Sequence, residues 1–112
     1  MKQLDTELLA GYLENLGVAV VTQMLDLYVE QSKVYLTEIA QAVMSKSQND
    51  WQERCHKMKG AAGSVGLLTV HQQLVAIEKS SESWQQKEQY LHALNVENSS
   101  AIEAFSLWIS QQ

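Results

Sequence analysis

The chain contains no proline, and its apolar residues recur at intervals of three and four along nearly its whole length. Such spacing lines up apolar side chains on one face of an α-helix, which an internal proline would break. No segment alternates with a period of two over a length that would predict a strand. The clearest stripe predicts one long amphipathic helix, and its members are Val21, Leu25, Tyr28, Ser32, Tyr35, Ile39 and Val43.

Polar residues and glycines mark where further helices begin and end. Asp5 can cap a short first helix, and Gly17 stands where that helix would finish. The polar stretch 47–50 contains N-cap candidates for a third helix over about residues 50–65. Gly66 then follows as a helix stop.

Two more apolar stripes complete the pattern. One runs over residues 67–77, and the last occupies residues 91–109, where Asn98-Ser99-Ser100 interrupts it. The interruption is either a kink or a polar patch on one long helix. The predicted fold is all-α: an antiparallel four-helix bundle with an additional short N-terminal helix, formed by residues 1–112 as a single domain.

Composition excludes several classes of partner and compartment. Thirteen acidic against eight basic residues give a net charge of −5, which does not suit a nucleic-acid binder. The longest apolar runs, such as 18–21, are far too short to span a membrane. A single cysteine, Cys55, cannot form an intrachain disulfide, which fits a reducing compartment. We therefore expect a cytoplasmic, monomeric domain, and its short flanks favour one excised from a longer protein.

The segment 51–67, WQERCHKMKGAAGSVGL, is the most informative part of the chain. At about 100° per residue, two groups of its side chains fall on two different sectors of a helix. The apolar group predicts the buried face and consists of Trp51, Cys55, Met58, Ala62 and Val65. The second group consists of Gln52, His56, Lys59, Gly60 and Gly63.

Glycine inside a helix costs about 1 kcal/mol relative to alanine, so two of them in one sector need a reason. Gly60 and Gly63 would leave a smooth, open surface beside His56 for the approach of another macromolecule, although Gly63 could instead permit close helix packing. Residues 51–61 also carry a net charge of +2 within this acidic chain. Such a positive spot would attract a phosphate or an acidic partner.

The residue types in this sector suit phosphoryl transfer. A neutral imidazole has a nitrogen lone pair that can attack phosphorus, and Lys59 can neutralise part of the phosphate charge. No metal-binding pair of histidines or cysteines occurs, and GAAGSVG lacks the lysine of a phosphate-binding loop. The chain is therefore expected to hold no metal and no ATP, and to act as a phosphocarrier.

The pattern HxxKGxxxxxG, formed by His56, Lys59, Gly60 and Gly66, resembles the histidine-containing phosphotransfer (HPt) domain. The fuller string HKMKGAAGSVGL is most similar to the C-terminal HPt domains of hybrid sensor kinases of the anaerobic-respiration and trimethylamine-N-oxide type. The resemblance implies that His56 is phosphorylated through Nε2, that Lys59 contacts the phosphoryl group and that Gly60 leaves room for the partner.

The resemblance also implies the partners: receiver domains of a response regulator and of a hybrid kinase, which would supply Mg²⁺. The chain itself would need no cofactor, and it could belong to the cytoplasmic part of an inner-membrane sensor kinase. Family members often carry a glutamine twenty-two residues after the histidine, bonded near the imidazole. This chain has Glu78 there. In a hairpin that turns near Leu67, we expect Glu78 to lie level with His56.

Two other interpretations remain beside this one. A helical adaptor could dock a receiver-like partner through the face of Gly60 and Gly63 without any chemistry. The chain could also be a small helical enzyme or metal protein, which a metal assay would test. The other two histidines, His71 and His92, have no comparable neighbours in sequence and are expected to be ordinary surface residues.

Overall fold

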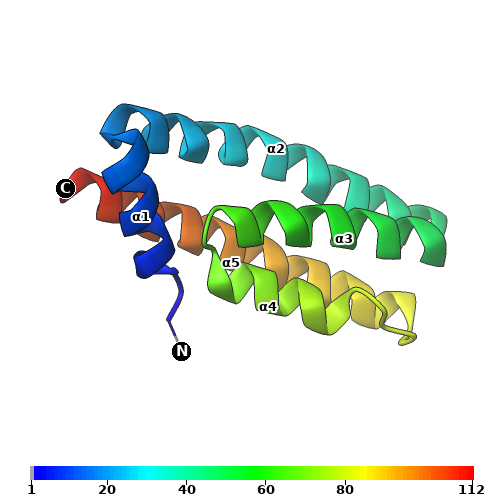
Figure 1. The fold of residues 1–112 in the computed structure, drawn as a ribbon. Coiled ribbons are helices and arrows are strands. Elements are labelled where there is room, and N and C mark those ends of the chain that lie inside the picture. The colour runs from blue at the N-terminus through cyan, green and yellow to red at the C-terminus, as the bar shows by residue number, and fades with distance from the viewer. Residues whose placement is uncertain (1) are drawn as a thin grey trace.

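The computed structural model describes residues 2–112 and contains five helices in that range: α1 (Thr6–Leu16), α2 (Val18–Ser45), α3 (Gln48–Ser64), α4 (Leu68–Ile77) and α5 (Trp84–Ser110). Helices α2 to α5 form a closed ring, in which α2 contacts α3 and α5 and α4 contacts the same two helices. Figure 1 shows α1 lying across one end of this bundle. The predicted all-α four-helix bundle with a short N-terminal helix is confirmed.

The helix boundaries have local causes that the sequence predicted. The Asp5 side chain accepts a hydrogen bond from the backbone N–H of Leu8 at 3.0 Å, which caps α1. Gly17 ends α1 with a positive φ of 84°. Ser47 caps α3 by accepting from the N–H of Asp50 at 3.2 Å, so α3 begins two residues earlier than expected.

The N-terminal segment closes that end of the bundle over the α3–α4 turn. The N–H of Asp5 donates to the carbonyl of Gly66 at 2.8 Å, and the N–H of Leu68 donates to the carbonyl of Gln3 at 3.0 Å. The hydroxyl of Tyr12 donates to the carbonyl of Ser64 at 2.9 Å. These bonds satisfy backbone groups that the ends of α3 and α4 leave free. None of the helices in the described range combines the length and apolar character that a membrane span requires.

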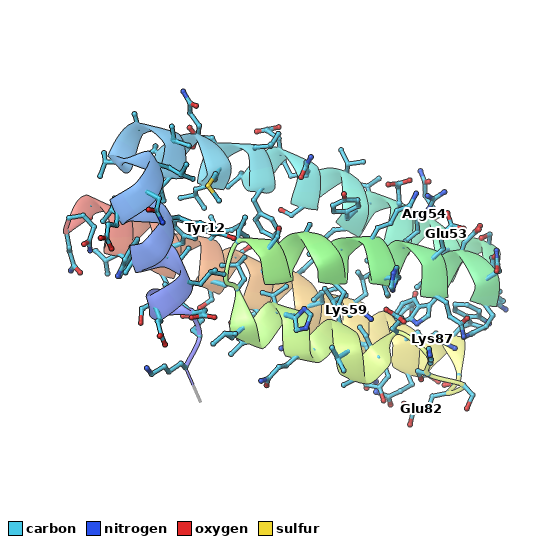
Figure 2. All side chains as sticks on the ribbon, viewed as in Figure 1. Tyr12, Glu53, Arg54, Lys59, Glu82 and Lys87 are labelled. Atoms are coloured by element: carbon cyan, nitrogen blue, oxygen red, sulfur yellow. The ribbon has the colours of Figure 1, made fainter. Side chains whose placement is uncertain are left out.

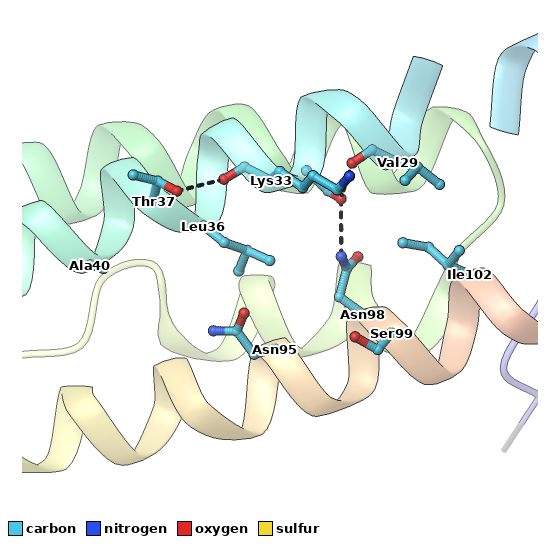
Figure 3. Close-up of a pocket in the computed structure, with 10 residues that line it drawn as sticks. Val29, Lys33, Leu36, Thr37, Ala40, Asn95, Asn98, Ser99 and Ile102 are labelled. Carbon is cyan, nitrogen blue, oxygen red and sulfur yellow. Dashed lines mark hydrogen bonds between the residues drawn. The ribbon is translucent and has the colours of Figure 1, made fainter. Parts of the chain in front are cut away.

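Helix α5 is continuous through Asn98-Ser99-Ser100, so the interruption is a polar patch on one long helix, in which Asn98 is buried and the two serines are exposed. The Asn98 side chain is 3% exposed and accepts a hydrogen bond from the Tyr28 hydroxyl at 2.7 Å. Its amide nitrogen donates to the hydroxyl of Ser32 at 3.1 Å. Figure 3 shows Asn98 reaching from α5 towards α2 in a groove of about 630 Å³ on the face opposite the α3–α4 pair.

Removing this polar contact should destabilise the bundle. In Asn98→Ala the buried Tyr28 hydroxyl loses its acceptor, so we expect the free energy of unfolding to fall by about 1–3 kcal/mol. Asn95→Ala is the matched control, because Asn95 lies on α5 but is exposed. Urea denaturation of the three proteins measures the difference. Equal stability of Asn98→Ala and the parent chain would contradict this account.

Candidate functional site

The turn between α3 and α4 determines which residues of the two helices lie side by side at the candidate site. The turn between these helices places Gly66 at φ 74°, a left-handed conformation that favours glycine, and the N–H of Leu67 bonds to the carbonyl of Ala62 at 3.0 Å. Residues equally distant from this turn then lie side by side. His56 on α3 and Glu78 at the end of α4 meet in this way, as the spacing predicted.

Three side chains meet at one oxygen atom. Glu78 Oε1 lies 3.3 Å from Nδ1 of His56 and 2.9 Å from Nζ of Lys59. The environments differ sharply, because the His56 side chain is 69% exposed and that of Glu78 only 9%. Lys59, labelled in Figure 2, lies between these extremes at 24%. The site is therefore an exposed imidazole that rests on a buried carboxylate.

The charge on Glu78 follows from its two partners. Burial by itself would raise the pKa of the Glu78 carboxyl, but the hydrogen bonds and charges of Lys59 and His56 outweigh it and hold the pKa below 4.5. The carboxylate is therefore ionised at neutral pH. The pKa of the Cys55 thiol shifts in the other direction. Burial, and to a smaller extent the negative charge of Glu78, raises it to about 12. Cys55 is thus a protonated core residue and not a reactive thiol.

The two glycines of this sector have different surroundings. A Cβ atom built on Gly60 would meet nothing within 4 Å, so the surface beside His56 is open there. A Cβ on Gly63 would lie 3.0 Å from Nδ1 of His71. The prediction that Gly63 forms part of the open face is therefore wrong. Gly63 instead allows α3 and α4 to pack closely, which was the alternative interpretation of this glycine.

His71 is accordingly not the ordinary surface residue that we expected. Its ring is half-buried against Gly63, and Nδ1 lies 3.1 Å from the backbone carbonyl oxygen of Lys59. Because a carbonyl only accepts, neutral His71 carries its proton on Nδ1. Residue spacing within α3 could not reveal this neighbour, since it comes from α4. His92 is exposed on α5, in agreement with the prediction.

The positive charge predicted around His56 is largely balanced by other helices. Arg54 Nε lies 3.4 Å from Oε2 of Glu38 on α2, and Lys57 pairs with Glu53 at 3.6 Å. Lys59 is paired with Glu78. A count over residues 51–61 omits Glu38 and Glu78, which approach only in the folded bundle. The expectation of a net positive spot was therefore wrong.

The last member of the predicted sector, Gln52, is half-buried on α3 one turn before His56. At a spacing of four residues, it lies on the same face of α3 as His56. Among residues 2–112, no group of three or more histidine, cysteine, aspartate or glutamate side chains is arranged to hold a metal ion.

Comparison with known protein families agrees with this geometry. The model of the Hpt domain matches residues 23–104, which include α3, α4 and most of α2 and α5. The chain belongs to the Hpt domain family. The matched region contains the whole His56, Lys59 and Glu78 cluster.

Individual proteins of known name are similar to this chain in sequence. It is 30% identical over 103 residues to the aerobic respiration control sensor protein ArcB of Escherichia coli K12, and equally so to ArcB of Shigella flexneri. Each match covers 83% of this chain but only 13% of the ArcB protein, so the chain spans about an eighth of those relatives.

Solved structures give the same result. The histidine-containing phosphotransfer domain of E. coli ArcB superposes with a TM-score of 0.85 at 25% identity, covering 97% of this chain and 94% of that one. Histidine-containing phosphotransfer protein B of Pseudomonas aeruginosa PAO1 superposes with a TM-score of 0.84 at 18% identity, covering 98% and 96%. The second likeness is one of fold.

The two glycines should respond differently to alanine. Gly60→Ala should raise the free energy of unfolding by about 1 kcal/mol, because alanine favours the helix and its methyl group enters open space. Gly63→Ala should raise the free energy of unfolding by less, because its methyl group would press on the ring of His71. Urea denaturation measures both effects, in the parent chain and in the His71→Ala variant. In the His71→Ala variant, Gly63→Ala should raise the free energy of unfolding as much as Gly60→Ala does. Equal gains at both glycines in the parent chain would contradict the packing account.

The loss of folding stability at low pH should depend on Glu78. Since the folded pKa of this carboxyl lies below its ordinary value, its stabilising contribution is present above pH 4.5 and is lost as the pH falls through the folded pKa. The parent should exceed Glu78→Gln in stability at pH 7, and their difference should shrink below about pH 4.5. Thermal unfolding across this range tests the expectation. A difference that stays constant with pH would refute it.

Proposed function

We propose that this Hpt domain carries a phosphoryl group on Nε2 of His56 and relays it between aspartate side chains of receiver domains. Histidine phosphotransfer in a phosphorelay is the function of the family, and it agrees with the likeness to the ArcB phosphotransfer domain. The observation that carries the assignment to His56 is its exposed ring beside a buried, ionised Glu78.

The contact with Glu78 prepares His56 as a nucleophile. A carboxylate only accepts hydrogen bonds, so the neutral imidazole donates to it from Nδ1–H. The lone pair then lies on Nε2, on the side of the ring away from Glu78. No base has to remove a proton before Nε2 attacks phosphorus, which makes the exposed edge reactive at neutral pH.

Lys59 and Gly60 would serve the incoming phosphoryl group and its carrier. The Lys59 ammonium is held one helical turn from His56 and can offset negative charge as it builds up on the phosphoryl oxygens. Open space beside Gly60 lets a receiver domain bring its aspartate close to Nε2. Gln52 would lie at the edge of the same contact.

The receiver is the natural source of Mg²⁺, and the Hpt domain would act as a phosphocarrier that needs no nucleotide. We place it in the cytoplasm as a monomer, working with receivers of a response regulator and of a hybrid kinase. The similarity to ArcB, of which this chain covers 13%, supports a sensor-kinase setting.

The site assignment predicts which histidine takes up phosphate. A phosphorylated receiver domain should label the chain with an acid-labile, base-stable phosphate, because a phosphoryl group on imidazole nitrogen has that stability. His56→Gln should abolish the label, as seen by autoradiography after transfer from ³²P-labelled receiver. Repeating the transfer with a panel of receiver domains should identify the cognate receiver as the one that transfers phosphate fastest.

The matched control is His92→Gln, which removes an exposed histidine from α5 and should label like the parent chain. Label retained by folded His56→Gln would overturn the assignment. Receiver binding without any transferable phosphate would instead support an adaptor that docks through the face around Gly60.

A further inference from the structure

Glu78 is more than a hydrogen-bond acceptor for His56, because it is a buried anion. An amide at this position could either donate to Nδ1 or accept from it, whereas a carboxylate can only accept. Its Oε1 atom is also held by Lys59 at 2.9 Å, so the negative charge stays fixed under the ring. The carboxylate therefore favours any state of His56 in which Nδ1 carries a proton.

We propose that Glu78 keeps Nδ1 of phosphorylated His56 protonated, so that the phosphoryl group leaves from a neutral imidazole and stays readily transferable. Glu78 is a positioning residue in this account, since it acts through His56 and does not touch phosphorus. The inference rests on the proposed function, in which His56 is the phosphorylated residue.

The bond changes show why this proton matters. When Nε2 attacks an acyl phosphate, the N–P bond forms from its lone pair, and the P–O bond electrons leave with the carboxylate of the receiver. The ring keeps Nδ1–H and becomes a cation facing Glu78. In the reverse transfer the N–P electrons return to Nε2, which regenerates neutral imidazole. Without the Nδ1 proton the leaving group would be an imidazolate, which is far more basic and leaves slowly.

Other charged groups on the helices around His56 have partners of their own, and on α3 Lys57 pairs with Glu53 at 3.6 Å. From α3, Lys59 opposes the cation, but its ammonium is already paired with the same carboxylate. On α2, Glu38 is engaged by Arg54. On α5, the ammonium of Lys87 lies over the rings of Trp84 and Trp51, with Nζ 4.3 Å from the ring centre of Trp84, and it donates to the carbonyl of Glu82. Among residues 2–112, the acidic side chain that contacts the ring is Glu78.

Lys59 makes the arrangement compatible with a phosphoryl group. An unpaired carboxylate beside the site would repel the phosphoryl oxygens. With Nζ bound to Oε1, the Lys59–Glu78 pair is neutral as a unit, and the flexible ammonium keeps two further hydrogen atoms for an anion. The pair can therefore stabilise the ring proton on one side and the phosphoryl charge on the other.

The experiment uses phosphoramidate, which phosphorylates histidine directly and needs no receiver. Loss of phosphate from the parent, Glu78→Gln and Glu88→Gln is followed by ³¹P NMR from pH 5 to 10. Glu88 is exposed on α5, which makes it the matched control. Protonated phosphoimidazole hydrolyses faster, so the midpoint of the rate profile should fall by about one pH unit in Glu78→Gln. The profile of Glu88→Gln should equal that of the parent.

A second measurement needs only the parent chain, in case Glu78→Gln fails to fold. The ¹⁵N shift of Nδ1 in the phosphorylated protein should report a protonated nitrogen to higher pH than in a phosphohistidine peptide. Identical titration of protein and peptide, or a midpoint unchanged by Glu78→Gln, would overturn the inference while leaving His56 as the carrier. Absence of phosphate on His56 would instead refute the proposed function itself.

Discussion

The contact of His56 and Lys59 with one buried oxygen of Glu78 ties the surface of this bundle to its interior. Burial alone would raise the pKa of the carboxyl group, and the contacts with Lys59 and His56 lower it below its ordinary value. The carboxylate in turn fixes the ring and the ammonium on an otherwise exposed helix face. The arrangement of these side chains at the surface therefore depends on helix packing that places α4 against α3.

That packing is maintained at both ends of the hairpin. At the turn, Gly66 allows the sharp reversal, and the N-terminal segment bonds to it through the N–H of Asp5. At the other end, the indole N–H of Trp51 donates to the carbonyl of Ile77 at 2.9 Å, next to Glu78. Lys87 also closes this end by donating to the carbonyl of Glu82 at 2.8 Å (Figure 2). These bonds hold α3 and α4 together on both sides of the contact between His56 and Glu78.

The two faces of the bundle serve different purposes. The α2–α5 face has a groove of about 630 Å³ and a buried polar contact between Asn98 and Tyr28, which joins the two long helices. The α3–α4 face has the exposed ring of His56 and open space beside Gly60. Phosphoryl transfer between proteins needs an accessible nucleophile more than a deep cavity, so the functional site need not lie in the groove.

Periodicity along the chain was sufficient to predict the helices, their order and the buried stripes, because these depend on contacts between residues three and four apart. The same local spacing placed His56, Lys59 and Gly60 on one face, and equal distance from the turn predicted the meeting with Glu78. Contacts between helices depend on side-chain packing, which local spacing does not encode. Only the tertiary structure therefore showed that His71 covers Gly63 and that Glu38 and Glu78 balance the positive charge around His56.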